Sequence, residues 1–196
     1  MKSQKPAPQK PAPKKPATLA NHDRYSDDTI ADILREARVF AFVGASANTS
    51  RPSYFAMKYL LGKGYTIHPV NPGVAGQKIL GQTVYATLAD VPAPVDVIDI
   101  FRASDAALEV TREAIALKDK LGLKVLWMQL GVRNDEAARE AEAAGLKVIM
   151  NRCPKIEYGR LSGEIGWAGV STGRISSARP KLSPIGVQSH LISDKG

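Results

Sequence analysis

Five short runs of apolar residues recur along the chain, and they are separated by stretches with the spacing of amphipathic helices. Every position from Val39 to Val43 is apolar, which predicts a strand buried on both faces, as in a parallel sheet. We expect strands over residues 38–43, 65–70, 95–101, 123–128 and 146–150. We expect helices from residue 26 onward and over 52–62, 104–121 and 134–144.

This alternation of strands and helices, joined by short turns, predicts an α/β fold with a doubly wound parallel sheet of the Rossmann-like type. Right-handed crossovers must reverse direction to cover both faces of such a sheet, so we expect the strand order 3-2-1-4-5, counted along the chain. The carboxyl ends of the strands would then share one edge, where sheets of this type bind ligands.

The predicted helix starts carry residues suited to capping. Ser26, Ser104 and Asn134 are expected as N-caps, and Pro52 suits the first position of its helix because its φ is already fixed. The turn Asn71-Pro72 ends the second predicted strand, since proline cannot extend a ladder. A short extended excursion over 79–85 and a helical turn near 88–92 are expected to follow.

The two ends of the chain differ from its middle. Residues 1–22 form a Lys/Pro/Ala-rich tail that we expect to be disordered, and residues 23–157 form the Rossmann-like domain. After Pro154 the glycine spacing predicts loop-like structure, a lid or a dimer arm. We therefore expect a Gly-rich, partly disordered extension over 158–196 and a possible homodimer.

The net charge of +8 belongs to these ends. Residues 1–16 contain five lysines and no acid, residues 172–196 carry a net +3, and the segment between them is therefore neutral. A neutral middle argues against nucleic acid as a partner. A single cysteine, no signal peptide and no long apolar run predict a cytoplasmic protein without a disulfide or a membrane span.

The loop after the first strand predicts a phosphate site. Its sequence, GASANTSR over 44–51, ends at a predicted helix start and carries Arg51, which suits an anion. It is not the G-x-G-x-x-G loop of NAD sites, and no Asp or Glu occurs over residues 37–89 to bind a ribose diol. A ligand with an extra phosphate, NADP or coenzyme A, fits this edge better than NAD.

Longer motifs identify a family. The chain resembles the small stand-alone CoA-binding proteins, which are related to the nucleotide-binding domain of succinyl-CoA synthetase α subunits and of acyl-CoA synthetases. The motifs that carry the resemblance are VGAS with RPS (43–53), KYLL (58–61), HPVNPG (68–73), ILGQTVYATLADVP (79–92), VDVIDIFR (95–102), WMQLGV (127–132) and NRCPKIE (151–157).

The resemblance implies a CoA site whose phosphates lie at the first loop. It places the adenosine end near the turn Asn71-Pro72 and the strand end Phe101-Arg102. The candidate cofactor-binding residues are Gly44, Ala45, Ser46, Arg51, Pro52, Ser53, Asn71, Pro72, Phe101, Arg102, Gln129 and Gly131. The chain has no room for the phosphohistidine and ATP-grasp domains of a complete synthetase, so acyl-CoA ligation by this chain alone is not expected.

Several of these residues also have a structural interpretation. Ser46 could only stabilise its turn, and Arg51 could be a surface arginine. Phe101 could be a core residue, with Arg102 paired to Asp105. The alternatives stay open at the level of the sequence.

No catalytic constellation is predicted. Cys153 follows Arg152, which would lower the pKa of its thiol, but His22 and His190 lie in predicted tails and His68 is expected in the core. Acids, His and Cys never cluster at the spacing of metal ligands. We therefore expect a CoA carrier, sensor or regulatory module without chemistry of its own.

The alternative function is an NADP-dependent oxidoreductase that uses the same edge of the sheet. The chain lacks a hydride-transfer motif, because Tyr54 and Lys58 have the Tyr-x-x-x-Lys spacing but lie in the wrong helix. A third hypothesis, nucleic-acid binding through the basic tails, would require a steep dependence on salt.

Overall fold

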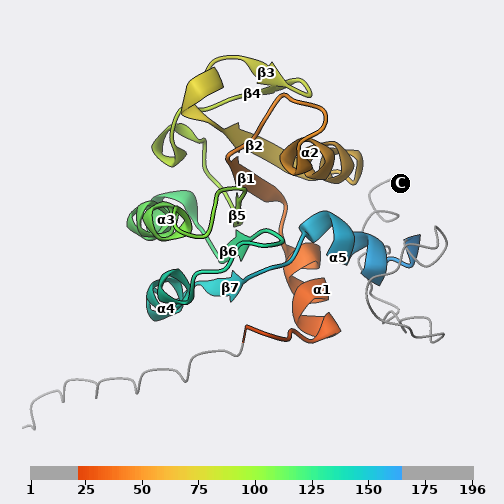
Figure 1. Ribbon diagram of the computed structural model, residues 1–196, viewed down its shortest axis with the longest axis vertical. Helices are drawn as coiled ribbons and strands as arrows, with labels where there is room; N and C mark the ends of the chain where they lie inside the picture. Colours follow the sequence, from red (N-terminus) through yellow and green to blue (C-terminus); the bar gives the residue numbers. More distant parts are fainter. Residues whose placement is uncertain (1–21, 165–196) are drawn as a thin grey trace, which may run out of the picture.

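The five predicted strands form one parallel sheet (Figure 1). The computed structural model describes residues 22–164, so the predicted tail before residue 22 and the extension beyond residue 164 lie outside the described part. The sheet has the order β2-β1-β5-β6-β7. Its strands are β2 (Thr66–Val70), β1 (Val39–Val43), β5 (Val97–Ile100), β6 (Val125–Met128) and β7 (Lys147–Ile149).

The α/β class is confirmed, and the predicted strand order is wrong. Counted among these five strands along the chain, the order is 2-1-3-4-5, because β5 pairs with β1 and not with β2. All four residues of β5 are buried, including Asp99, and a strand buried in this way needs a neighbour on each side. β5 therefore lies between β1 and β6, and the winding direction reverses between β1 and β5.

Helices cover both faces of the sheet (Figure 1). Buried side chains of one cluster come from three helices together with Phe40, Phe42 and Trp127 of the sheet. A second cluster on the opposite face joins two helices to Ala41, Ile98 and Leu126. The helices of the first face are α1 (Asp27–Glu36), α2 (Pro52–Gly62) and α5 (Pro154–Leu161), and those of the second are α3 (Ala107–Leu121) and α4 (Asp135–Ala143).

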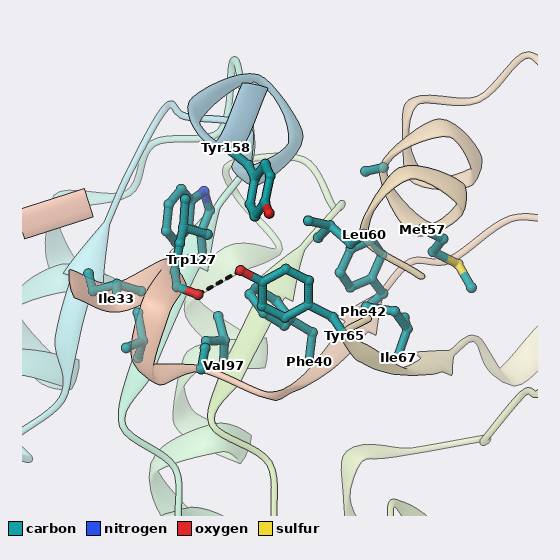
Figure 2. Close-up of a cluster of buried hydrophobic side chains, with 14 of the residues drawn as sticks. Ile33, Phe40, Phe42, Met57, Leu60, Tyr65, Ile67, Val97, Trp127 and Tyr158 are labelled. Carbon is teal, nitrogen blue, oxygen red and sulfur yellow. Dashed lines mark hydrogen bonds between the residues drawn. The ribbon is translucent and has the colours of Figure 1, made fainter. Parts of the chain in front are cut away.

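Aromatic side chains fill the first face (Figure 2). Phe40 packs edge-on against Tyr65 with 5.3 Å between ring centroids, a favourable arrangement for two rings. Two of these aromatics also bind the backbone through their polar ends: the Tyr65 hydroxyl donates to the Leu34 carbonyl at 2.6 Å, and Trp127 Nε1 donates to the Arg152 carbonyl at 2.8 Å. These bonds tie α1 and the start of α5 to the sheet.

Three of the four predicted helix starts are confirmed. The Ser26 and Asn134 side chains accept from the backbone N–H groups of Thr29 and Ala137, at 3.1 and 2.9 Å. Pro52 is the first residue of α2. Ser104 is not an N-cap, because α3 begins later, at Ala107.

Ser104 instead connects two loops at the carboxyl ends of the strands. Its hydroxyl accepts from the Arg133 N–H at 3.0 Å, and its carbonyl accepts from Asn134 Nδ2 at 2.9 Å. The side chain that a helix cap would have used therefore holds the β5–α3 loop against the β6–α4 loop.

The segment after β2 carries small elements of its own. The turn at Asn71 leads into η1 (Pro72–Val74), and the expected excursion is a hairpin of β3 (Lys78–Ile79) and β4 (Gln82–Thr83). The helical turn expected after it is η2 (Leu88–Asp90). The hairpin lies beside β2, where Tyr85 pairs with Val70.

Two expectations about the chain ends are corrected. Residues 154–161 form helix α5 and not a loop, because Tyr158 and Leu161 are spaced to bury themselves against the sheet. His22 is buried rather than part of a free tail, with Nδ1 2.9 Å from the Tyr25 hydroxyl and Nε2 3.2 Å from a Glu142 oxygen. Across residues 22–164, no helix has the length and apolar character needed to cross a bilayer.

Candidate functional site

The strand ends that carry the predicted site residues meet along one edge. Val43 is paired with Val70 and with Ile100, and Ile100 is paired with Met128, so β2, β1, β5 and β6 end level with one another. The residues that directly follow them therefore lie side by side. This edge collects Gly44, Ala45, Ser46, Asn71, Pro72, Phe101, Arg102, Gln129 and Gly131, and the α2 start adds Arg51, Pro52 and Ser53.

Gly44 begins the β1–α2 loop at a point where any side chain would be strained. Its φ is +90°, and a Cβ built on it would lie 2.7 Å from the carbonyl oxygen of Phe101. Its N–H donates to the Val70 carbonyl at 2.9 Å. The backbone at Gly44 thus runs directly against both neighbouring strand ends, and Ala45 after it is fully buried.

Asn71 holds this loop from the side of β2. Its Nδ2 donates to the Ala45 carbonyl at 2.7 Å, and its Oδ1 accepts from the Gly73 N–H at 2.9 Å. One side chain therefore fixes the β1–α2 loop and the turn after β2 relative to each other. Its predicted contact with a ligand stays a prediction, and its positioning role is a finding of the structure.

Between Ala45 and α2 the loop is built from side-chain turns. The Ser46 hydroxyl accepts from the Asn48 N–H at 3.2 Å. Asn48 Oδ1 accepts in turn from the N–H and the hydroxyl of Ser50, at 2.9 and 2.7 Å. The turn-stabilising interpretation of Ser46 therefore holds in the structure, and it leaves a second lone pair and the hydroxyl proton for other contacts.

The start of α2 has the electrostatics of an anion site. Arg51 is its N-cap without a side-chain capping bond, Pro52 occupies the first position, and the first turn contains no acid. The positive end of the helix dipole is therefore not neutralised by a carboxylate of its own helix. Ser53 is buried at this turn, whereas Arg51 is exposed and makes no ion pair with the residues of 22–164.

The end of β5 combines a buried ring with an exposed cation. The Phe101 ring packs on Phe42 with 4.9 Å between centroids, so Phe101 belongs to the edge of the core as well as to the candidate site. Arg102 is exposed, and the alternative pairing with Asp105 is absent from the described residues. The Asp105 carboxylate accepts from the Ala106 N–H instead, at 2.8 Å.

At the end of β6, Gln129 lies over a buried acid that the sequence analysis did not identify. Gln129 Nε2 is 3.0 and 2.8 Å from the two oxygens of Asp99, and Asp99 is fully buried. Burial raises the pKa of Asp99 well above its ordinary value, and the Gln129 bond opposes this only in part. The available signal was the carboxylate of Asp99 between apolar residues of the predicted strand, in the segment VIDI (97–100).

Gly131 and Asn151 connect the ends of β6 and β7. Gly131 has a φ of +77°, and its N–H donates to Asn151 Oδ1 at 2.8 Å. The contact fixes the loop directly after Gln129. Gly131 thus shapes this end of the edge, and its contact with a ligand stays a prediction.

Cys153 lies just before α5 and does not have the lowered pKa that activates a thiol. Its pKa is raised, first by burial and also by the nearby Asp99. Backbone N–H groups at the start of α5, from Ile156 and Lys155, lower it only partly. The expected lowering of the Cys153 pKa by Arg152 is not seen. Arg152 Nε lies 3.7 Å from Glu157 Oε1, and Arg152 Nη1 donates to the Asn151 carbonyl.

His68 lies in the middle of β2, away from the edge. Burial lowers its pKa, and its ring packs edge-on against Tyr85 at 5.7 Å between centroids. It therefore belongs to the packing of the sheet face. Among residues 22–164, no three His, Cys, Asp or Glu side chains are grouped so that they could hold a metal ion.

Several known proteins are similar to this chain in fold and sequence. A family model described as a CoA binding domain matches residues 38–159. The uncharacterized protein YneT of Bacillus subtilis (strain 168) is 31% identical over 129 residues, which cover 66% of this chain and 91% of YneT. A structure titled hypothetical protein from Pyrococcus horikoshii OT3 has a TM-score of 0.65 at 37% identity and covers 71% of this chain and 94% of its own.

A larger protein contains a related unit. The dinucleotide forming acetyl-coenzyme A synthetase 1 of Ca. Korarchaeum cryptofilum matches with a TM-score of 0.51 at 26% identity. The match covers 61% of this chain and 27% of the synthetase. Together with the family match, it confirms the resemblance that the sequence motifs indicated.

Proposed function

Since the chain belongs to the CoA binding domain family, which its residues 38–159 match, we propose that it binds coenzyme A or an acyl-CoA along the carboxyl edge of its sheet. The observation that carries the proposal is the start of α2. The N-terminus of α2 has no side-chain cap and no acid in its first turn. The loop that leads to it begins at Gly44, whose backbone lies against the ends of β2 and β5.

The phosphates of the ligand are assigned to this helix start. Backbone N–H groups at a helix N-terminus favour anions, and the exposed Arg51 adds a cation with no competing carboxylate in the described residues. Arg102 at the end of β5 adds a second exposed cation to the same edge. Two cations suit a ligand that carries a 3′-phosphate in addition to its pyrophosphate.

The adenosine end is assigned to the turn after β2 and the end of β5. Asn71 and Pro72 border the β1–α2 loop on one side, and Phe101 and Arg102 border it on the other. Arg102 offers a guanidinium plane and Phe101 part of a ring, and both groups stack on bases in other nucleotide sites.

We assign the protein a binding role without chemistry: a carrier, a sensor or a regulatory module. Two observations support this. The pKa of the Cys153 thiol is raised, and His68 lies away from the edge.

Isothermal titration with four ligands tests the proposal: CoA, 3′-dephospho-CoA, NADP and NAD. We expect CoA to bind most tightly, 3′-dephospho-CoA more weakly, and NAD not at all. Thermal unfolding should show the same order, because a ligand of the folded state raises Tm with concentration. Binding of NADP without binding of CoA would overturn the proposal and favour the oxidoreductase alternative.

A further inference from the structure

A small cavity lies at the amino ends of β5, β6 and β7, at the opposite end of the strands from the proposed CoA site. The carboxyl end of α1 forms its other wall. The cavity has a volume of about 250 Å³, roughly eight times the ~30 Å³ share of a water molecule in the liquid. This is room for a molecule of the size of an amino acid, and it is too little for a nucleotide.

The floor of the cavity is apolar. Val97 and Val125 are paired in register at the starts of β5 and β6, and both are buried. Paired residues of neighbouring parallel strands point to the same face of the sheet, which here is the face that α1 covers. Ile33 of α1 and Leu123 add further buried apolar surface. An apolar group of a ligand would therefore leave water in this cavity.

Lys147 adds a cation to this apolar row. It is the first residue of β7 and pairs in register with Val125, so its side chain starts on the same face of the sheet. It is exposed and forms no ion pair with residues 22–164. Lys124 differs, because its Nζ donates to Asp96 Oδ1 at 2.7 Å. Among the described residues that line the cavity, Lys147 is thus the cation left to bind an anionic group.

Glu36 supplies the opposite charge from the other wall. It lies three residues after the buried Ile33, on the same face of α1, and it forms no ion pair with the described residues. Glu36 is also the last residue of α1, so the negative end of the helix dipole adds to its charge. Asp96 does not compete for a cation, because its Oδ2 accepts from the N–H groups of Arg38 and Val39 at 2.9 and 3.1 Å.

We infer that this cavity binds a small zwitterion with an apolar side chain, of the class of the free aliphatic amino acids. The ammonium group of the ligand lies at Glu36 and the carboxyl end of α1, and its carboxylate lies at Lys147. Its side chain packs on Val97 and Val125. The inference does not depend on the binding of CoA at the other end of the strands.

Simpler ligands fit these walls less well. An anion such as phosphate would lie close to Glu36 and to the negative end of α1, and a simple cation would lie close to Lys147. A neutral apolar molecule would leave both charged groups without a partner. A zwitterion pairs with both of them while its side chain leaves water.

Four ligands that differ by one group test the inference by two-dimensional NMR titration of the full chain. Leucine has all three groups, glycine lacks the side chain, leucinamide lacks the carboxylate, and N-acetylleucine lacks the ammonium. We expect leucine to bind about twofold to tenfold more tightly than each of the others. Leucine should shift the amide signals of Gly145 and Lys147, which line the cavity, and should leave the signal of Gly44 unchanged.

Two variants connect each charge to the group that it binds. Glu36→Gln and Lys147→Gln should each weaken leucine about twofold to fivefold, as expected for an exposed charge pair. Glu36→Gln should also remove the advantage of leucine over N-acetylleucine, and Lys147→Gln its advantage over leucinamide. A residue that only supports the fold would weaken all four ligands alike. Glu109→Gln and Lys78→Gln are the matched controls, since both residues are exposed and lie outside the cavity.

Three results would overturn the inference. The first is a leucine titration without saturable shifts at Gly145 and Lys147, and the second is a glycine affinity equal to that of leucine. The third is an equal loss of leucine binding in the control variants and in Glu36→Gln and Lys147→Gln. The ligand series on the wild-type protein tests the cavity even if a variant fails to fold, and none of these results bears on the binding of CoA.

Discussion

The backbone of Gly44 and the carbonyl of Phe101 are so close that a single methyl group on Gly44 would clash with the carbonyl oxygen. A Cβ at Gly44 would lie 2.7 Å from the Phe101 oxygen, and the φ of +90° disfavours any side chain. We predict that Gly44→Ala lowers the free energy of unfolding by about 2–4 kcal/mol, from backbone strain and the contact with a rigid carbonyl together. Urea unfolding measures the change.

Gly81→Ala is the control for the part of this loss that comes from backbone strain alone. Gly81 has a φ of +81° with open space around its Cβ position, so alanine there meets only the backbone penalty, about 1–2 kcal/mol. Equal losses at both positions would show that the β1 and β5 ends can separate without cost. CoA binding should survive in Gly81→Ala and fall in Gly44→Ala.

Asn71 is predicted to act through the loop that it holds. Asn71→Asp keeps the oxygen that accepts from Gly73 but replaces the donor to the Ala45 carbonyl with a second oxygen. We expect a loss of about 1–3 kcal/mol of stability, because two oxygens now face each other, and weaker CoA binding. Thermal unfolding and titration at pH 7 measure both.

The same substitution at Asn134, the N-cap of α4, is the control for Asn71→Asp. Asn134→Asp keeps an N-cap that accepts from Ala137, and it also loses a donor, to the Ser104 carbonyl. It should weaken the β5–α3 connection without changing CoA affinity. If Asn71→Asp behaves in the same way, Asn71 does not position the phosphate loop.

Arg51 is predicted to contribute by charge. Arg51→Ala should weaken CoA by about 1.5–3 kcal/mol, the usual worth of a hydrogen bond to a charged group. Arg51→Lys should recover part of this, since a lysine keeps the charge without the fork of donors. Calorimetry at two salt concentrations checks both variants.

Lys58→Ala on the same helix is the matched control for Arg51. Lys58 is exposed like Arg51 but lies nearly two turns from the helix start. Its removal lowers the net charge equally and should change affinity by no more than a general electrostatic effect. An identical loss in both variants would remove Arg51 from the site.

The sequence allowed much of this edge to be predicted, for a physical reason. Runs of apolar residues fix where buried strands begin and end, and in a parallel sheet their carboxyl ends must share an edge. Gly44, Asn71, Phe101 and Gln129 were therefore assigned correctly to one place on the fold without knowledge of which strands are neighbours.

The strand order and the partners of single side chains could not be predicted in the same way. Strand order depends on where the crossover after β2 leads, and a run of apolar residues does not show which buried strand will be its neighbour. Helix α5 was missed because glycines after Pro154 suggested a loop, although Tyr158 and Leu161 have helical spacing. The contact of Asp99 with Gln129 joins residues 30 positions apart, so only the pairing of β5 with β6 reveals it.

Asp99 is predicted to make stability depend on pH. Burial raises its pKa in the folded state, so between about pH 4, where the unfolded carboxyl loses its proton, and the raised value, the folded state binds more protons. The contribution of Asp99 to stability therefore falls as pH rises through this window, by at most about 1.4 kcal/mol per pH unit. His68, whose pKa burial lowers, contributes in the opposite direction, so the effect of Asp99 is the difference between the wild-type and Asp99→Asn curves. Asp99→Asn should remove this slope, whereas Asp119→Asn, at a carboxylate 95% exposed, should keep it. Urea unfolding from pH 5 to 8 measures the three curves, and a wild-type curve parallel to that of Asp99→Asn would contradict the prediction.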